Sequence, residues 1–154
     1  MGNIQIYNAS AGSGKTFTLV KSFLKLILAT ENVEAYKTLL AITFTNKAVN
    51  EMKERVINQL LLFSTSDALV EEGEKKASDD IMFVQLAQEL LLSHEELQER
   101  SQKVLKHILH NYAGFTITTI DGFNQRLIRS FAFDLKLNPN FEVFLETDDL
   151  LRLA

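Results

Sequence analysis

Apolar residues along the chain form short runs of strand length, separated by longer stripes with helical spacing. Residues 4–7 alternate, 39–44 form a continuous apolar run typical of an interior parallel strand, and 115–120 predict a third strand. Residues 15–29 carry apolar side chains around most of a helix, and 46–63 carry a stripe spaced three or four apart. Strands that alternate with helices predict an α/β fold with a parallel sheet.

The middle and the end of the chain predict further helices. A charged break at 71–80 precedes two helical stretches, at 79–92 and 94–112, and Ser93 and Glu96 fit the capping box of the second. Three more elements are expected after the third strand: a helix at 122–133, a strand at 141–144 and a helix that begins near 147.

Composition excludes several classes of function. Cysteine is absent, which excludes disulfides, thiolate zinc sites and cysteine nucleophiles. No apolar run approaches the ~18–20 residues of a membrane span, and the N-terminus does not have the pattern of a secretory signal. We therefore expect a soluble, cytoplasmic protein that does not enter a membrane.

The net charge of the chain is unevenly distributed. Residues 67–100 contain ten acidic and three basic residues, which gives this segment a net charge of −7. Since the whole chain has a net charge of −4, the remaining residues together carry +3. The overall acidity is therefore a poor guide to what the flanking segments bind.

Residues 9–16 match the phosphate-binding loop of nucleotide-binding proteins, except that alanine stands at the first glycine position. Gly12 and Gly14 would let backbone N–H groups surround a phosphate, Lys15 would contact the β- and γ-phosphates, and Thr16 would ligate Mg²⁺. The predicted nucleotide-binding residues are Ser10, Ala11, Gly12, Ser13, Gly14, Lys15, Thr16 and Phe17. Lys15 and Thr16 are the predicted catalytic residues; the alternative is a glycine-rich turn that happens to precede a lysine.

Three segments together resemble one family. Residues 9–18 resemble motif I, 41–56 motif Ia and 118–127 motif Ib of the UvrD/Rep helicases, above all of the RecB/AddA branch, in which the first loop glycine is commonly alanine. The resemblance implies the RecA-like P-loop NTPase fold, here an incomplete first motor lobe. Residues 1–64 and 113–154 would form that lobe, and 65–112 a small helical subdomain inserted into it.

The resemblance also implies contacts with single-stranded DNA. For motif Ia the expected contacts are Thr43, Phe44, Thr45, Asn46 and Lys47, and for motif Ib they are Thr119, Gly122 and Arg126. Phe44 could stack on a base; alternatively, it is the last core residue of its strand and Asn46 merely caps the next helix. Asp121 stands where the family usually has histidine, and we expect it to cap the 122–133 helix because a carboxylate repels phosphate.

Two other functions stay open at this point. Asp121 could be the Mg²⁺-orienting acid of a small P-loop kinase or NTPase, or the chain could be a non-catalytic module that binds nucleotide or DNA. His107 and His110 lie three apart, without an evident third metal ligand, and are expected to be solvated.

Helicase motifs II to VI are not found in the sequence. The leading expectation is therefore that the chain is the N-terminal piece of an ATP-dependent DNA helicase, which could be of the helicase–nuclease type. Its expected ligands are ATP and Mg²⁺, and its expected partners are single-stranded DNA and the remaining helicase domains. We also expect little ATP hydrolysis by this piece alone and unpaired sheet edges that favour self-association.

Overall fold

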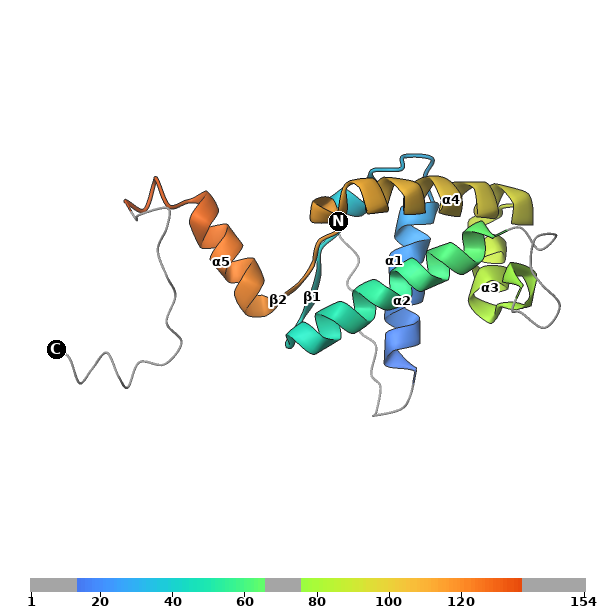
Figure 1. Ribbon diagram of the computed structural model, residues 1–154, viewed down its shortest axis with the longest axis horizontal. Helices are drawn as coiled ribbons and strands as arrows, with labels where there is room; N and C mark the ends of the chain where they lie inside the picture. Colours follow the sequence, from blue (N-terminus) through green and yellow to red (C-terminus); the bar gives the residue numbers. More distant parts are fainter. Residues whose placement is uncertain (1–13, 66–75, 137–154) are drawn as a thin grey trace.

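Helices dominate the part of the chain that the computed structural model describes, residues 14–65 and 76–136. The predicted strands at 4–7 and 141–144, the helix start near 147 and loop residues 9–13 lie outside it. In chain order the elements are α1 (Lys15–Leu28), η1 (Ala35–Thr38), β1 (Ala41–Thr43), α2 (Asn46–Ser64), η3 (Ala77–Asp79), α3 (Ile81–Leu90), α4 (His94–His110), η4 (Tyr112–Gly114), β2 (Ile117–Thr119) and α5 (Ile120–Ser130) (Figure 1).

Within the described residues the sheet consists of β1 and β2, which pair in parallel with Ala41 opposite Ile117 and Thr43 opposite Thr119. Each strand is three residues long, so the predicted α/β class is confirmed only as a small parallel sheet in a mostly helical structure. The predicted strand at 39–44 is observed as Ala41–Thr43, but Ile42 is 45% exposed, so the burial expected of an interior strand is not found among the described residues. A continuous apolar run shows that both faces of a strand can be buried. Whether they are buried depends on which elements pack against the sheet.

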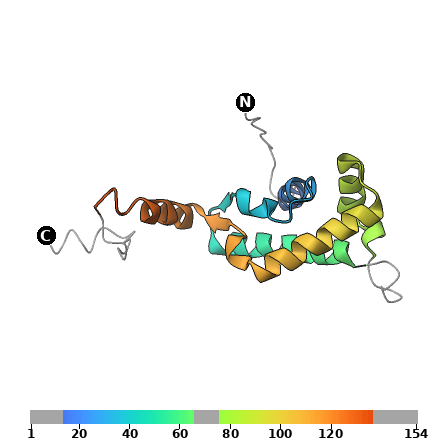
Figure 2. The same ribbon diagram turned by 90° about the horizontal axis from the view of Figure 1, so that it is seen from above.

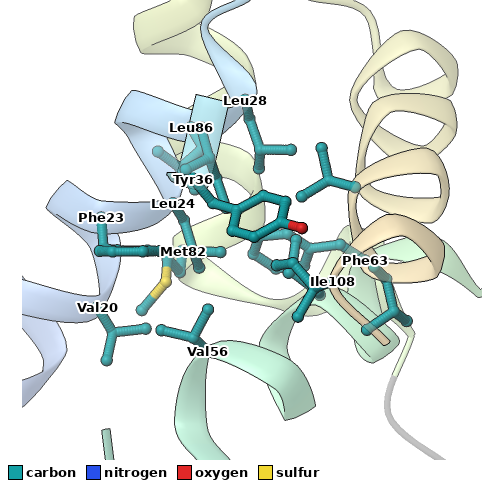
Figure 3. Close-up of a cluster of buried hydrophobic side chains, with 14 of the residues drawn as sticks. Val20, Phe23, Leu24, Leu28, Tyr36, Val56, Phe63, Met82, Leu86 and Ile108 are labelled. Atoms are coloured by element: carbon teal, nitrogen blue, oxygen red, sulfur yellow. The ribbon is translucent and has the colours of Figure 1, made fainter. Parts of the chain in front are cut away.

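Helices α1, α2, α3 and α4 share one hydrophobic core. In Figure 1, α1 runs across α2 and α4, which pack against each other. Figure 3 shows the Tyr36 ring among side chains of this core, including Leu24 of α1 and Ile108 of α4. Helices α3 and α4 of the predicted insert therefore pack directly on the helix that follows the phosphate loop.

An ion-pair cluster on the surface also joins α1 to α3. The Glu89 carboxylate accepts hydrogen bonds from Lys21 Nζ at 2.6 Å and Lys25 Nζ at 2.7 Å, and Lys21 also donates to Gln85 Oε1 at 2.7 Å. The bonds from Lys21 and Lys25 lower the pKa of Glu89 to about 2. The cluster links the helix of the nucleotide motif to the predicted insert through charge as well as packing.

Threonine hydroxyls begin two helices at the sheet. Thr45 Oγ1 accepts the Ala48 N–H at 3.2 Å at the start of α2, and Thr119 Oγ1 accepts the Gly122 N–H at 3.1 Å at the start of α5. The alternative that Asn46 caps α2 and the expectation that Asp121 caps the last of these helices are therefore wrong. Each threonine directly precedes its helix with extended backbone angles, as a cap requires, so the predicted caps fall inside the first turn instead.

The predicted capping box at the start of α4 is confirmed. Ser93 Oγ accepts the Glu96 N–H at 3.1 Å, and the Glu96 carboxylate accepts the Ser93 N–H at 2.8 Å. This reciprocal pair depends on residues three apart, which is why sequence spacing alone was enough to find it.

Helix α5 extends away from the four-helix core in both views (Figures 1 and 2). None of its residues is buried, and Leu127, Ile128 and nearby Phe131 are exposed among the described residues. The amphipathic pattern therefore predicts this helix correctly. Its apolar face, however, is not covered by any other element of the described chain. No helix in 14–65 or 76–136 is long and apolar enough to cross a membrane.

Candidate nucleotide and nucleic-acid site

The last glycine of the predicted phosphate loop has a left-handed backbone. Gly14 has φ 79° and ψ 17° immediately before α1, and its carbonyl accepts the Thr18 N–H at 3.0 Å and the Thr18 hydroxyl at 3.2 Å. A Cβ at this position would meet nothing within 4 Å, so glycine is favoured here by the backbone conformation and not by a lack of space.

The residues after Gly14 form the first turn of α1. Lys15 and Phe17 are exposed, Thr16 is partly buried, and this turn contains no acidic side chain. The start of α1 thus combines the positive end of the helix dipole with the Lys15 ammonium and the Thr16 hydroxyl. This combination suits a polyphosphate with its magnesium ion. Predicted site residues Ser10, Ala11, Gly12 and Ser13 lie outside the described residues.

The carboxyl ends of the two strands bring motifs Ia and Ib together. Thr43 lies opposite Thr119 in the parallel register, so the residues that follow β1 and β2 start from the same edge of the sheet. The caps leave two threonines useful to a ligand: the oxygens of Thr45 and Thr119 accept from their helices, and each hydroxyl hydrogen can still be donated.

Phe44 is the most informative side chain at this edge. It is 83% exposed, which excludes the alternative that it is the last core residue of its strand. Asn46 and Lys47, in the first turn of α2, are exposed as well. An exposed aromatic ring and a nearby cation are the kinds of group with which proteins bind single-stranded nucleic acid.

In motif Ib, the backbone of Gly122 lies close to two threonine side chains of β2. A Cβ on Gly122 would come within 2.8 Å of Thr118 Oγ1 and 3.1 Å of Thr119 Oγ1. Thr118 is buried, so it has little room to yield. Glycine is therefore needed at position 122 to form the β2–α5 junction, whether or not this residue also contacts DNA. Asp121 and Arg126 are exposed on α5.

Sequence reasoning missed one cation further along α2. Lys53 of α2 has its Nζ 5.0 Å from the centroid of the Tyr112 ring and 6.0 Å from that of Phe115. Burial, and secondarily the charge of Arg126, lower the pKa of Lys53. Lys53 lies within the motif Ia segment, but no pattern in the sequence indicates that Tyr112 would face it.

His107 is a structural residue. Its Nδ1 lies 3.0 Å from the Tyr36 hydroxyl and its Nε2 lies 3.3 Å from Glu34 Oε1. The expectation of a solvated histidine is therefore wrong for His107, because the η1 turn, which is distant in sequence, packs against α4. Burial raises the pKa of Tyr36. Among the described residues, no group of three histidines or carboxylates could hold a metal ion.

Comparison with known proteins decides the family. Residues 2–154 match the UvrD/REP helicase N-terminal domain. The chain belongs to this family. The resemblance found in motifs I, Ia and Ib is thereby confirmed. No solved structure matches the chain significantly.

Several curated UvrD/REP relatives align with nearly the whole chain. It is similar to an ATP-dependent helicase/nuclease subunit of Thermoanaerobacter sp. (strain X514), with 32% identity over 97% of this chain and 10% of the relative. The protein of the same name from Bacillus cytotoxicus is 33% identical over 93% of this chain and 9% of the relative. The RecB component of the RecBCD enzyme of Haemophilus influenzae is 29% identical over 98% of this chain and 13% of the relative. The chain thus spans about a tenth of the length of these relatives.

Proposed function

We propose that this chain is the N-terminal ATP-binding part of a DNA helicase or translocase that couples ATP hydrolysis to movement along single-stranded DNA. The observation that carries the proposal is the parallel register of β1 and β2, in which Thr43 lies opposite Thr119. This register brings the motif Ia and motif Ib segments to one edge of the sheet, beside the exposed ring of Phe44.

The nucleotide side of the proposal rests on motif I. UvrD-family helicases bind ATP with Mg²⁺. In this chain the loop 10–17 would hold the nucleotide, with the Lys15 ammonium on the β- and γ-phosphates and the Thr16 hydroxyl on the metal. Bound ATP would supply the free energy for movement. The left-handed Gly14 and the first turn of α1, which lacks acidic residues, support this assignment.

The DNA side rests on exposed groups at the sheet edge. Phe44 would stack on a base, while the Lys47 ammonium and the Asn46 amide, in the first turn of α2, would bind the adjoining backbone. Thr43, Thr45, Thr119, Gly122 and Arg126 complete the proposed DNA-binding set. The Thr45 and Thr119 hydroxyls would donate to phosphate oxygens while they continue to cap α2 and α5.

The biological setting follows from the relatives. Proteins named as ATP-dependent helicase/nuclease subunits, and the RecB component of a RecBCD enzyme, align with this chain. We propose that the chain works in DNA repair or recombination together with further helicase domains.

Replacement of Phe44 tests this function. Phe44→Ala should weaken binding of a fluorescein-labelled oligothymidine by about 5- to 150-fold, because stacking of one base on an aromatic ring contributes about 1–3 kcal/mol. Fluorescence anisotropy titrations at fixed salt measure this change. Phe133→Ala is the matched control, since Phe133 is 93% exposed and lies outside the three motifs.

The two variants give a clear decision. The proposal requires that Phe44→Ala weaken binding while Phe133→Ala leaves it unchanged. Equal effects of both substitutions, or a wild-type chain that does not bind the oligonucleotide, would contradict the DNA-binding role.

A further inference from the structure

A groove of about 400 Å³ lies between α2 and the η4 turn. Its lining contains amide, cationic and aromatic side chains: Asn50, Lys53, Glu54, Ile57, Asn58 and Tyr112. It lies outside the residues of motifs I and Ib and beyond the part of motif Ia assigned to DNA above. Its chemistry nevertheless resembles that of the sheet edge, since a cation lies beside a partly exposed aromatic ring.

Lys53 is held in a defined position in this groove. Its Nζ lies over the rings of Tyr112 and Phe115, at 5.0 and 6.0 Å from their centroids. Phe115 is buried, whereas Tyr112 is 46% exposed, so one of the two rings that position the cation is also open to a ligand. Among the described residues Lys53 has no ion pair within 4 Å, and its charge is therefore available to an external anion.

The groove lies further along α2 than the proposed DNA site. Asn46, Asn50 and Lys53 are spaced four and three residues apart, which places them on one face of the helix. With a rise of about 1.5 Å per residue, Lys53 lies about 10 Å along the axis from Asn46. A polynucleotide that contacts the first turn of α2 can therefore reach Lys53 without leaving this face.

We propose that the groove binds a further nucleotide of the single strand, with a phosphate against the Lys53 ammonium and a base against the exposed part of the Tyr112 ring. The inference rests on the proposed function and extends its binding site from the sheet edge to the middle of α2. The amides of Asn50 and Asn58 supply hydrogen-bond donors and acceptors around the same nucleotide.

The local charge supports an anionic ligand. Burial, and secondarily the positive charge of Arg126 on α5, lower the pKa of Lys53, so the ammonium stands in a partly desolvated and net positive environment. Glu54 also lines the groove and offsets part of this positive charge. A phosphate against Lys53 would offset this positive charge, whereas an uncharged ligand would leave it in place.

Salt-dependent binding tests the groove. The wild-type chain and its variants are titrated with labelled oligothymidine at several salt concentrations. Lys53→Gln should reduce the slope of log K against log salt by about 0.7, the value for loss of one phosphate contact with a single strand. Lys53→Arg should keep the wild-type slope. Lys106→Gln is the matched control, because Lys106 is exposed on α4 and does not line the groove.

A second pair of variants tests the aromatic ring. Tyr112→Ala should weaken binding by fivefold or more, whereas Tyr112→Phe should bind like the wild type, since stacking needs the ring and not the hydroxyl. Far-UV circular dichroism of each variant separates loss of binding from loss of fold.

The outcomes distinguish this inference from the proposed function. Equal slopes for wild type and Lys53→Gln, with Phe44→Ala still weakening binding, would overturn the groove and leave the sheet-edge site in place. A changed slope with no effect of Phe44→Ala would support the groove and contradict the Phe44 contact. A wild-type chain that does not bind the oligonucleotide would overturn both.

Discussion

Replacement of Glu89 with Gln removes a carboxylate that connects two helices. Glu89 of α3 accepts from Lys21 at 2.6 Å and from Lys25 at 2.7 Å, both on α1. Glutamine has nearly the same shape and can still accept hydrogen bonds, but it carries no charge. The substitution therefore tests the ionic part of the link between the nucleotide-motif helix and the predicted insert.

The magnitude follows from the pKa of Glu89, which falls from 4.5 to about 2. At about 1.4 kcal/mol per pKa unit, this shift corresponds to at most about 3 kcal/mol of folding free energy. The Glu89 side chain is 37% exposed, and solvent screens such pairs strongly. We therefore expect Glu89→Gln to lower the free energy of unfolding by about 1 kcal/mol at pH 7.

The pH dependence has a definite sign. Because folding lowers the pKa of Glu89, its contribution is fully present above the unfolded value of 4.5 and is lost as pH falls towards 2. The difference in stability between wild type and Glu89→Gln should therefore be constant at neutral pH. It should fall to less than half by about pH 3, since the unfolded carboxyl takes up its proton first.

Urea unfolding followed by circular dichroism at about pH 7 and about pH 3 measures this difference. Glu99→Gln is the matched control: Glu99 bonds Lys103 within one helix at 2.7 Å, and both side chains are more than half exposed. We expect it to change stability much less than Glu89→Gln does, because solvent screens so exposed a pair. The reasoning is refuted if the Glu89→Gln difference is as large in acid as at neutral pH, or if Glu99→Gln costs as much at neutral pH.

Three further predictions concern caps, the core and catalysis. Thr45→Ala should lower the free energy of unfolding by about 1 kcal/mol, because it removes the cap of α2. Thr119→Ala should reduce the helical circular dichroism signal with little change in the unfolding midpoint, because α5 has no buried residue. Equal midpoint shifts for the two variants would contradict this. Tyr36→Phe should cost about 1 kcal/mol in urea unfolding, since it removes the 3.0 Å bond to His107 and leaves the ring in place; an unchanged midpoint would show that this bond contributes nothing. The chain alone should hydrolyse little or no ATP in a steady-state phosphate-release assay, because motif II is not found in its sequence; turnover that Lys15→Ala abolishes would refute this.

Local features could be predicted because their causes are local. The helix at 15–29 is observed as Lys15–Leu28, and the 46–63 stripe as Asn46–Ser64. The Ser93–Glu96 capping box depends on two side chains three residues apart. Such features follow from helical periodicity and neighbouring hydrogen bonds, which a single segment contains.

Helix caps show where local reasoning failed. Asn46 and Asp121 are good capping residues by type, yet Thr45 and Thr119 cap α2 and α5. A cap needs an extended backbone directly before the helix, and the ends of β1 and β2 place that backbone one or two residues earlier than expected. Residue type identified suitable candidates, but strand pairing selected the position.

The motifs, their order and hence the family were readable from the sequence alone, because phosphate and nucleic-acid contacts depend on short runs of particular residue types. The tertiary structure decided what those runs meet. It exposes Phe44, places Thr43 opposite Thr119, sets Lys53 over Tyr112 and joins His107 to Tyr36. Each of these relations brings together atoms from separate segments or depends on what packs around a residue, and no local pattern of side chains specifies such contacts.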